Sequence, residues 1–317
     1  MKKFLTKFLI FCLILCVAVV TVNTIYLKKT KTKHDMISNA SYEKFENVPY
    51  NIELCNFGSS HGANNYYYDN IQDKYTCFNF ALPSQTLEYD YRILEYYKDH
   101  IREGAIIFIT VSYMSLYGID EALYDDFQSK NKRYYHFLPK EYIKEYDYKT
   151  DFFESYFPVL VQYDQLVPSL IEGDTSIEDW ESTADEIDLD RYVAEAYKRH
   201  LITNKIDDQG KRIVNEESVE SLYDMIDLCR ELHARPILIT TPYLREYTDI
   251  IRENAPDFLE EFNRLVNKIA KKKNVPYYDY AFDNRFDDKY SLFMNADHLN
   301  KEGALKFVEI LLQEIHY

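Results

Sequence analysis

The sequence predicts an α/β fold built on a mainly parallel, five-stranded sheet. Five short apolar runs, each long enough for a buried strand, are separated in most cases by segments with helical periodicity. Strands that alternate with helices form a parallel sheet with helices on both faces. In such sheets the active site lies beyond the carboxyl ends of the strands.

The predicted strands are 51–57 (NIELCNF), 75–80 (YTCFNF), 105–112 (AIIFITVS), 236–241 (PILITT) and 275–280 (VPYYDY). Apolar residues at helical spacing predict helices over 84–101, 217–232, 256–270 and 301–315. Asn300 is placed to cap the last of these helices. The stretch 116–212 breaks the alternation and is rich in Tyr, Asp and Glu. We expect it to be a helical insertion near the site, either a lid or substrate platform or a solvated appendage.

An apolar run of 19 residues without charge, 8–26, has the length that a helix needs to cross a bilayer. A cleaved signal peptide is the alternative, but no small-residue cleavage pattern follows the run. We therefore predict a cytoplasmic tail (1–7), a transmembrane anchor (8–26), a polar stalk (27–48) and a catalytic body (49–317) with the insertion. Lysines flank both ends of the run, so they do not decide its orientation.

Charge argues against nucleic acid as a partner. The chain carries −16 overall, and the segment through residue 33 holds seven lysines and no acidic residue. The rest therefore carries −23, which repels polyphosphate. The 31 tyrosines suit stacking on sugars but also fill cores.

The five cysteines show no metal-like spacing. Cys55 and Cys77 lie on strands expected to be neighbours, and we predict free thiols there, with a disulfide as the alternative.

A small-residue string, Gly58-Ser59-Ser60-His61-Gly62, follows the first predicted strand directly. A serine at a strand end, in a tight turn, can present both its hydroxyl and its own N–H to one ligand atom. Ser60 is therefore a candidate nucleophile. His61 is interpreted as a loop residue without a catalytic role, in preference to a base or metal ligand.

The second candidate segment is Asn295-Ala296-Asp297-His298, just before the last helix. A histidine there can be held rigidly, and a neighbouring side chain can fix its tautomer. His298 is the candidate base. Asn295 and Asp297 are both candidates for orienting it. The acidic residues Asp283, Asp287 and Asp288 lack the spacing of a cation-binding loop, and no metal or cofactor is expected.

Together these segments resemble the SGNH/GDSL hydrolases, particularly bacterial cell-surface members that acylate or deacylate polysaccharides. Gly58-Ser59-Ser60 takes the place of the G-D-S string, and Asn295 through His298 that of D-x-x-H, with Asn295 at the usual acid position. The resemblance implies a flavodoxin-like three-layer sandwich. It also implies that Ser84, where glycine is usual, joins Ser60 in the oxyanion hole. The G-x-S-x-G elbow of α/β-hydrolases also fits, but there several strands normally precede the nucleophile.

The third block of that family supplies an asparagine to the oxyanion hole, and here the stretch reads Val111-Ser112-Tyr113-Met114-Ser115. We expect Ser112, Tyr113 and, after strand 4, Tyr243 to contact substrate. Losing one oxyanion donor costs about a hundredfold or more in rate.

The resemblance implies an O-acyltransferase or esterase outside the cell membrane, acting on cell-surface glycan, beside a multi-spanning membrane protein that exports the acyl group. Two alternatives are open: a non-catalytic polysaccharide-binding or assembly protein on the same fold, and a membrane-proximal lipid esterase.

Overall fold

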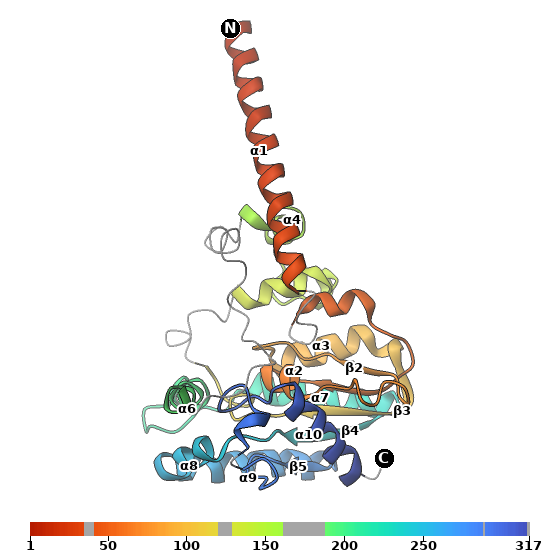
Figure 1. Cartoon of the computed structure of the whole chain (residues 1–317), viewed down its shortest axis with the longest axis vertical. Coiled ribbons are helices and arrows are strands. Elements are labelled where there is room, and N and C mark those ends of the chain that lie inside the picture. The colour runs from red at the N-terminus through yellow and green to blue at the C-terminus, as the bar shows by residue number, and fades with distance from the viewer. Residues whose placement is uncertain (35–40, 120–128, 161–187, 288, 316–317) are drawn as a thin grey trace.

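The computed structural model describes residues 1–34, 41–119, 129–160, 188–287 and 289–315 (Figure 1). Five parallel strands form one sheet in the order β2-β1-β3-β4-β5. They are β1 (Ile52–Phe57), β2 (Cys77–Asn79), β3 (Ile101–Thr110), β4 (Arg235–Thr240) and β5 (Tyr277–Asp279). This is the flavodoxin-like order, and it confirms the predicted fold class.

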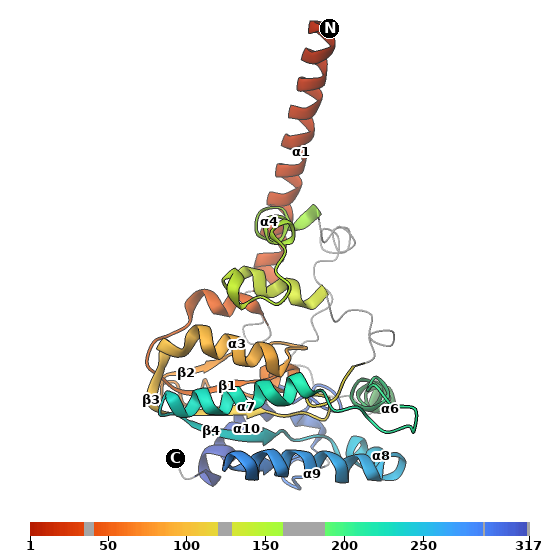
Figure 2. The same cartoon turned by 180° about the vertical axis from the view of Figure 1, so that it is seen from behind.

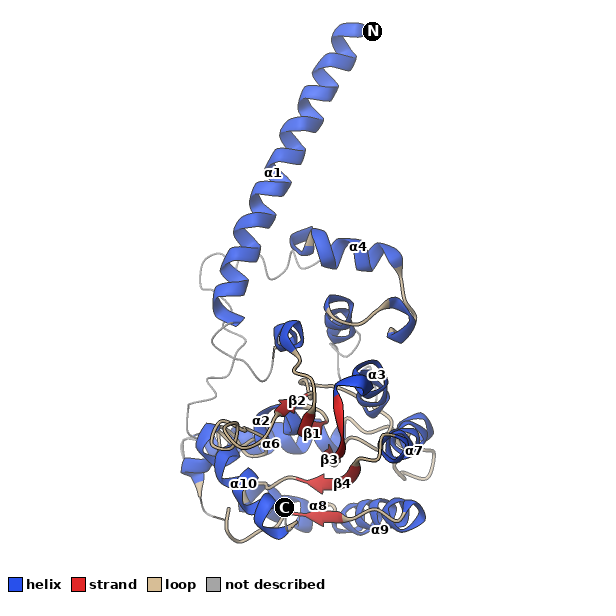
Figure 3. Cartoon of the chain, turned by 90° about the vertical axis from the view of Figure 1, so that its right-hand side faces the viewer, coloured by secondary structure: helices blue, strands red, loops and turns tan. Residues whose placement is uncertain are grey.

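Helices cover both faces of the sheet (Figure 3). On one face lie α3 (Leu87–Tyr97), α7 (Glu216–Glu231) and α9 (Pro256–Lys273). On the other lie α2 (Ser60–Asn65) and α10 (Lys301–Glu314). Side chains of β3 alternate between these layers, because Ile107 and Ile109 join the first cluster while Ile106 and Phe108 join the second.

The four predicted helices are present, with ends that shift by a few residues. The Asn300 side chain accepts a hydrogen bond from the Gly303 N–H at 3.0 Å, which confirms the predicted cap of α10. One further helix, α8 (Arg245–Asn254), follows β4 and was not predicted. Single turns flank other elements at η2 (Lys98–His100) and η8 (Tyr290–Leu292).

The thiols of Cys55 and Cys77 are free, as expected. Cys77 is paired across the strands with Leu54, and Cys55 with Phe78. Because successive side chains of a strand point to opposite faces, the two sulfurs lie on opposite sides of the sheet and cannot bond.

The N-terminal helix α1 spans Lys2–His34 and stands away from the body (Figure 2). Among the described residues it is the one helix long and apolar enough to cross a membrane. Within the segment predicted as a stalk, α1 continues to His34, and a short helix η1 (Tyr42–Asn47) packs on the body. Phe45 of η1 is buried and stacks on Phe137 with ring centroids 3.9 Å apart.

The described parts of the predicted insertion are mostly short helices. They are η3 (Ser129–His136), η4 (Lys140–Tyr142), α4 (Tyr148–Tyr156), η5 (Pro158–Leu160), α6 (Leu189–Tyr197) and the π-helical turn η7 (Lys198–Ile202). Its two ends meet in antiparallel bridges, Tyr117 with Val214 and Ile119 with Asn204. Residues 120–128 and 161–187 of the predicted insertion lie outside the described residues.

Candidate active site

Ser60 is the first residue of α2, directly beyond the carboxyl end of β1. The turn that we predicted as a loop is therefore the start of a short helix. Gly58 makes the turn possible, because its φ of +134° is rarely adopted by other residues and an added Cβ would lie 2.7 Å from the Thr110 Cβ. The first N–H groups of a helix have no intrahelical acceptor. The Ser60 side chain is half-buried, so its hydroxyl and N–H can meet a ligand.

Three asparagines fix α2 to its surroundings. The Gly62 carbonyl accepts hydrogen bonds from the side-chain amides of Asn56 (2.8 Å) and Asn79 (3.0 Å). Asn65, at the other end of α2, accepts a hydrogen bond from the Leu299 N–H at 2.8 Å. This bond ties the helix that carries Ser60 to the loop that carries His298.

Asp90, a buried residue of α3, joins the two loops predicted to form the oxyanion hole. Its Oδ1 accepts hydrogen bonds from the Gly58 N–H (3.0 Å) and from the Gln85 side chain (2.6 Å). Burial raises the pKa of Asp90 to about 7, although both hydrogen bonds oppose the rise. The neighbouring Ser84 has a left-handed backbone with φ of +57°. Asp90 thus holds the turns of Ser60 and Ser84 in a fixed relation.

Asn295 orients the His298 ring. Its Oδ1 lies 3.0 Å from His298 Nδ1 and also accepts the N–H groups of Asp297 and His298. With Nδ1 protonated toward this oxygen, Nε2 carries the lone pair. His298 Nε2 is buried and has no hydrogen-bond partner among the described residues. A neutral imidazole in this tautomer can accept a proton at Nε2.

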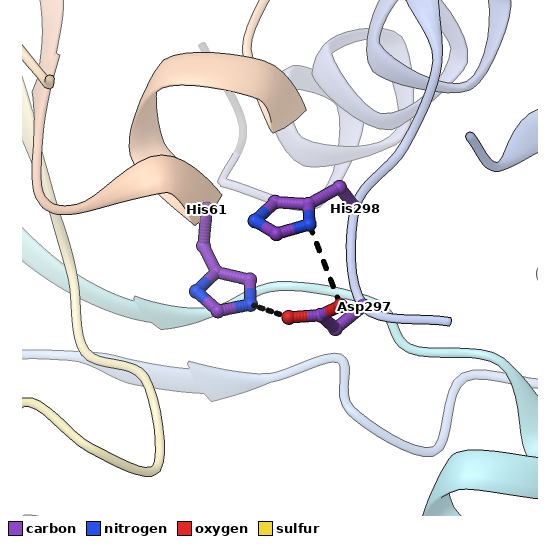
Figure 4. A group of neighbouring side chains, drawn as sticks. All are labelled: His61, Asp297 and His298. Atoms are coloured by element: carbon purple, nitrogen blue, oxygen red, sulfur yellow. Dashed lines mark ion pairs between the residues drawn. The ribbon is translucent and has the colours of Figure 1, made fainter. Parts of the chain in front are cut away.

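Asp297, the other candidate for orienting His298, is fully buried and contacts several basic side chains. Its Oδ1 lies 3.4 Å from His298 Nδ1 and 2.9 Å from an Arg199 nitrogen. Its Oδ2 lies 3.3 Å from His61 Nε2 (Figure 4). The same oxygen lies 3.2 Å from His200 Nε2. Burial would raise the pKa of the Asp297 carboxyl, but His298 and Arg199 outweigh it and hold that pKa well below its usual range.

Two of these neighbours come from the insertion and were not identified from the sequence. Arg199 and His200 lie in η7, and His200 Nδ1 is held by the Tyr247 hydroxyl at 2.5 Å. The adjacent Arg-His pair was the available signal, but nothing in the local pattern places it beside Asp297.

The prediction for His61 needs a correction. The residue is not in a loop but within α2, and it is buried against Asp297 rather than exposed. Burial lowers the pKa of His61 to about 3, so the ring is neutral.

His61, Asp297 and His298 each offer a possible metal ligand, and these atoms lie within 4.8 Å of one another. The rings of His61 and His298, however, stack with an interplanar angle of 13° and centroids 4.8 Å apart. Imidazole binds a metal through a lone pair in the plane of its ring. An ion in the plane of one ring therefore lies outside the plane of the other, and the cluster does not fit a metal.

Ser112, Tyr113 and Tyr243, which we expect to contact substrate, are buried side chains in the structure. Each is 1% exposed. The Tyr113 ring packs edge-on against Phe262 in the core, and Ser112 bonds to Ser115. Tyr243, which follows β4, packs against the Tyr113 ring with centroids 5.2 Å apart.

A cleft of about 820 Å³ opens beside the candidate site, between the strand ends and the insertion. The sheet side contributes Ser59, Ser84 and Ser115, and the insertion contributes Tyr135 and Lys144. A cavity of this size and mixed lining accommodates a small molecule or part of a polymer.

No profile of a known protein family matches the sequence, and no curated protein matches it. Among solved structures, the chain is similar to a protein from Bacteroides fragilis described as an acylhydrolase, with 12% identity, a TM-score of 0.37, and coverage of 86% of this chain and 92% of that one. It is also similar to a mutant of an acetyl-xylooligosaccharide esterase from Geobacillus Stearmophilus, with 12% identity, a TM-score of 0.38, and coverage of 85% and 96%.

A third similar structure is a Streptococcus pneumonia protein described as a platelet activating factor, with 12% identity, a TM-score of 0.41, and coverage of 95% and 99%.

Proposed function

We propose that the chain carries out serine-dependent ester chemistry on cell-surface glycan, transferring or removing acyl groups through an acyl-Ser60 intermediate. The observation that carries the proposal is a half-buried serine on α2, a helix that Asn65 bonds to the loop of His298. The His298 Nδ1 is held by Asn295, and its Nε2 has no hydrogen-bond partner among the described residues. A nucleophile and an oriented base are the parts that acyl transfer needs.

In the proposed mechanism His298 Nε2 accepts the hydroxyl proton of Ser60 while the oxygen attacks the ester carbonyl. The carbonyl electrons move onto oxygen, and the N–H groups of Ser60 and Ser84 stabilise that oxyanion. Collapse of the intermediate breaks the bond to the leaving alcohol, which takes the proton from His298. Water or a sugar hydroxyl then attacks the acyl-enzyme by the same steps in reverse.

Asp297 supports His298 by charge in this scheme. Its carboxylate lies 3.4 Å from His298 Nδ1 and stays ionised, so it favours the imidazolium that forms during the attack. Asn295 supplies the directional hydrogen bond. Asp297 and Asn295 together provide the charge and the orientation that one carboxylate provides in a Ser-His-Asp triad.

The cleft supports a glycan as the acceptor. It reaches Ser59 and Ser84, and tyrosines such as Tyr89 and Tyr135 line it. Aromatic rings with polar edges suit sugar faces and hydroxyls. The apolar helix α1 supports a single-pass location. The proposed glycan substrate requires the body to lie outside the cell, where a multi-spanning membrane protein would deliver the acyl group.

Product analysis tests the proposal. The purified full-length chain is incubated with an acetylated oligosaccharide, with and without an unacetylated acceptor, and the products are separated by mass spectrometry. Loss of acetyl to water alone assigns an esterase, and acetyl on the acceptor assigns a transferase. Both activities should disappear in Ser60→Ala.

Two results would contradict the proposal. Glycan binding without turnover, unchanged in Ser60→Ala, would assign a binding protein. Hydrolysis of lysophospholipid but not of acetylated sugar would assign a lipid esterase.

A further inference from the structure

The helix α4 exposes a stripe of three aromatic side chains, Tyr148, Phe152 and Tyr156. Their exposed fractions are 68%, 49% and 65%, and Leu160, just beyond, is 45% exposed. Residues four apart lie on the same face of a helix, so the three rings form one continuous surface. The rings of Phe152 and Tyr156 are in contact, with centroids 5.5 Å apart. We name these four side chains the α4 stripe.

The α4 stripe lies beside the membrane-spanning candidate. Asn23 of α1 donates a hydrogen bond to the Tyr156 carbonyl at 2.9 Å and accepts one from the Val159 N–H at 3.4 Å. Asn23 is 6% exposed and Tyr26 is 4% exposed, whereas the apolar side chains earlier in α1 are mostly exposed. Figures 1 and 3 place α4 at the height of the lower turns of α1, on the same side of the sheet as that helix.

This contact fixes the depth of the α4 stripe relative to a bilayer. Asn23 precedes the end of the apolar run 8–26 by three residues, a rise of about 4.5 Å along a helix. A bilayer spanned by that run therefore has its boundary close to the carbonyl of Tyr156. Tyrosine and other large amphipathic side chains are enriched at this depth.

The charges of α4 agree with the same location. Lys149 is exposed and lies over the Tyr148 ring at 6.0 Å, where it can meet lipid phosphate. The acidic residues turn toward the protein: Glu154 is buried 3.7 Å from Lys132, and Asp151 pairs with the Tyr146 hydroxyl. No acidic side chain therefore belongs to the α4 stripe.

We propose that the α4 stripe is a second membrane contact, which inserts into the headgroup region of the bilayer that α1 spans. Its ligand is the lipid surface itself. This membrane contact does not depend on the chemistry at Ser60, but it explains the position of the cleft. Part of the cleft is lined by Lys132, Tyr135 and Thr150, which belong to the segment that ends in α4. The membrane contact therefore holds this side of the cleft at the membrane surface.

Tryptophan reporters in the full-length chain test the proposal. The chain has one tryptophan, Trp180, which is first replaced by phenylalanine. Phe152→Trp is then introduced, and the protein is reconstituted into phosphatidylcholine–phosphatidylglycerol vesicles that contain lipids brominated near the headgroup. We expect bromine to reduce the fluorescence of this reporter.

Two further tryptophan variants serve as the positive and the negative control. Phe11→Trp, three residues inside the N-terminal end of the apolar run, reports insertion of α1. Asn267→Trp, exposed on α9 at the end of the molecule opposite α1, reports the background (Figure 1). Tyr156→Trp replaces Phe152→Trp if the latter fails to fold.

The proposal is wrong if the α4 reporters are quenched no more than Asn267→Trp while Phe11→Trp is quenched strongly. Protection of the stripe by a second copy of the chain would give that outcome together with a dimeric mass in detergent.

Discussion

Asp90 and Asp297 are both buried beside the candidate site, yet their surroundings shift their pKa values in opposite directions. Asp90 receives hydrogen bonds from neutral groups, the Gly58 N–H and the Gln85 amide, and burial raises its pKa to about 7. Asp297 is just as buried, but Arg199 and His298 keep its pKa well below the usual range. Burial alone favours the neutral acid, and neighbouring cations reverse that preference.

The difference separates two tasks. The region around Asp90 fixes the backbone of the turns at Ser60 and Ser84 through hydrogen bonds from neutral groups. The region around Asp297 supplies the fixed negative charge that a proton-accepting His298 requires. The insertion contributes Arg199 and His200 to the second region.

The largest effect is expected from the base. Replacing His298 by alanine should lower kcat/KM for p-nitrophenyl acetate by about 10²- to 10⁴-fold, because general-base catalysis contributes that much. The measurement is the initial rate, with circular dichroism as the control for folding. A variant that folds and keeps full activity would place the base elsewhere.

Asp90→Asn should change how stability depends on pH. The native pKa of Asp90 lies above the unfolded value of 3.8. The native protein therefore binds the extra proton between about pH 4 and 7, and its stability falls as pH rises through that window. The shift to about 7 corresponds to at most about 4 kcal/mol.

The asparagine keeps the Oδ1 acceptor and does not ionise, so the variant should gain stability over the parent at pH 8 and little at pH 4. Urea unfolding at both pH values measures the difference. An equal difference at both would contradict the raised pKa.

Asp297→Asn should show the opposite behaviour. The native pKa is depressed, so the stabilising charge is present above about pH 4 and is lost as pH falls below it. Removing one partner of a buried ion pair costs about 3 kcal/mol. The variant should lose that much at pH 7, and its deficit should shrink in acid. A loss of stability that is the same at every pH would show that the substitution acts through packing and not through charge.

A smaller effect is expected from the insertion. Arg199→Met removes one charged hydrogen bond to Asp297. The Arg199 side chain is 32% exposed, so the free energy of this bond lies near the lower end of the range for charged hydrogen bonds, about 1.5 kcal/mol. If all of it acts in the transition state, kcat/KM falls about tenfold. Arg191→Met is the matched control, because Arg191 pairs only with exposed acids on its own helix. Equal effects of the two substitutions would remove Arg199 from the site.

The sheet and the strand-end residues could be predicted from the sequence because their signals are local. The apolar runs located all five strands, and Asn300 correctly marked the start of α10. The string 58–62 was predicted at the end of the first strand and the segment 295–298 just before the last helix, where the structure has them.

The residues around Asp297 could not be predicted, because their contacts are long-range. Arg199 is 98 residues from Asp297 in the chain and lies in the insertion, which breaks the alternation of strands and helices. Tyr113 and Tyr243 were assigned to substrate from their place after strands, but their rings are buried against other aromatic side chains. Which way a side chain points after a strand depends on packing that the local sequence does not specify.

Covalent labelling tests the central claim most directly, that Ser60 is an activated nucleophile. The purified full-length chain is treated with a fluorophosphonate and weighed intact, beside Ser60→Ala and the neighbouring control Ser59→Ala. We predict a single adduct on the parent and on Ser59→Ala, and none on Ser60→Ala. Absence of an adduct on the parent, where a reference serine esterase labels fully, or an adduct that persists in Ser60→Ala, would contradict the account.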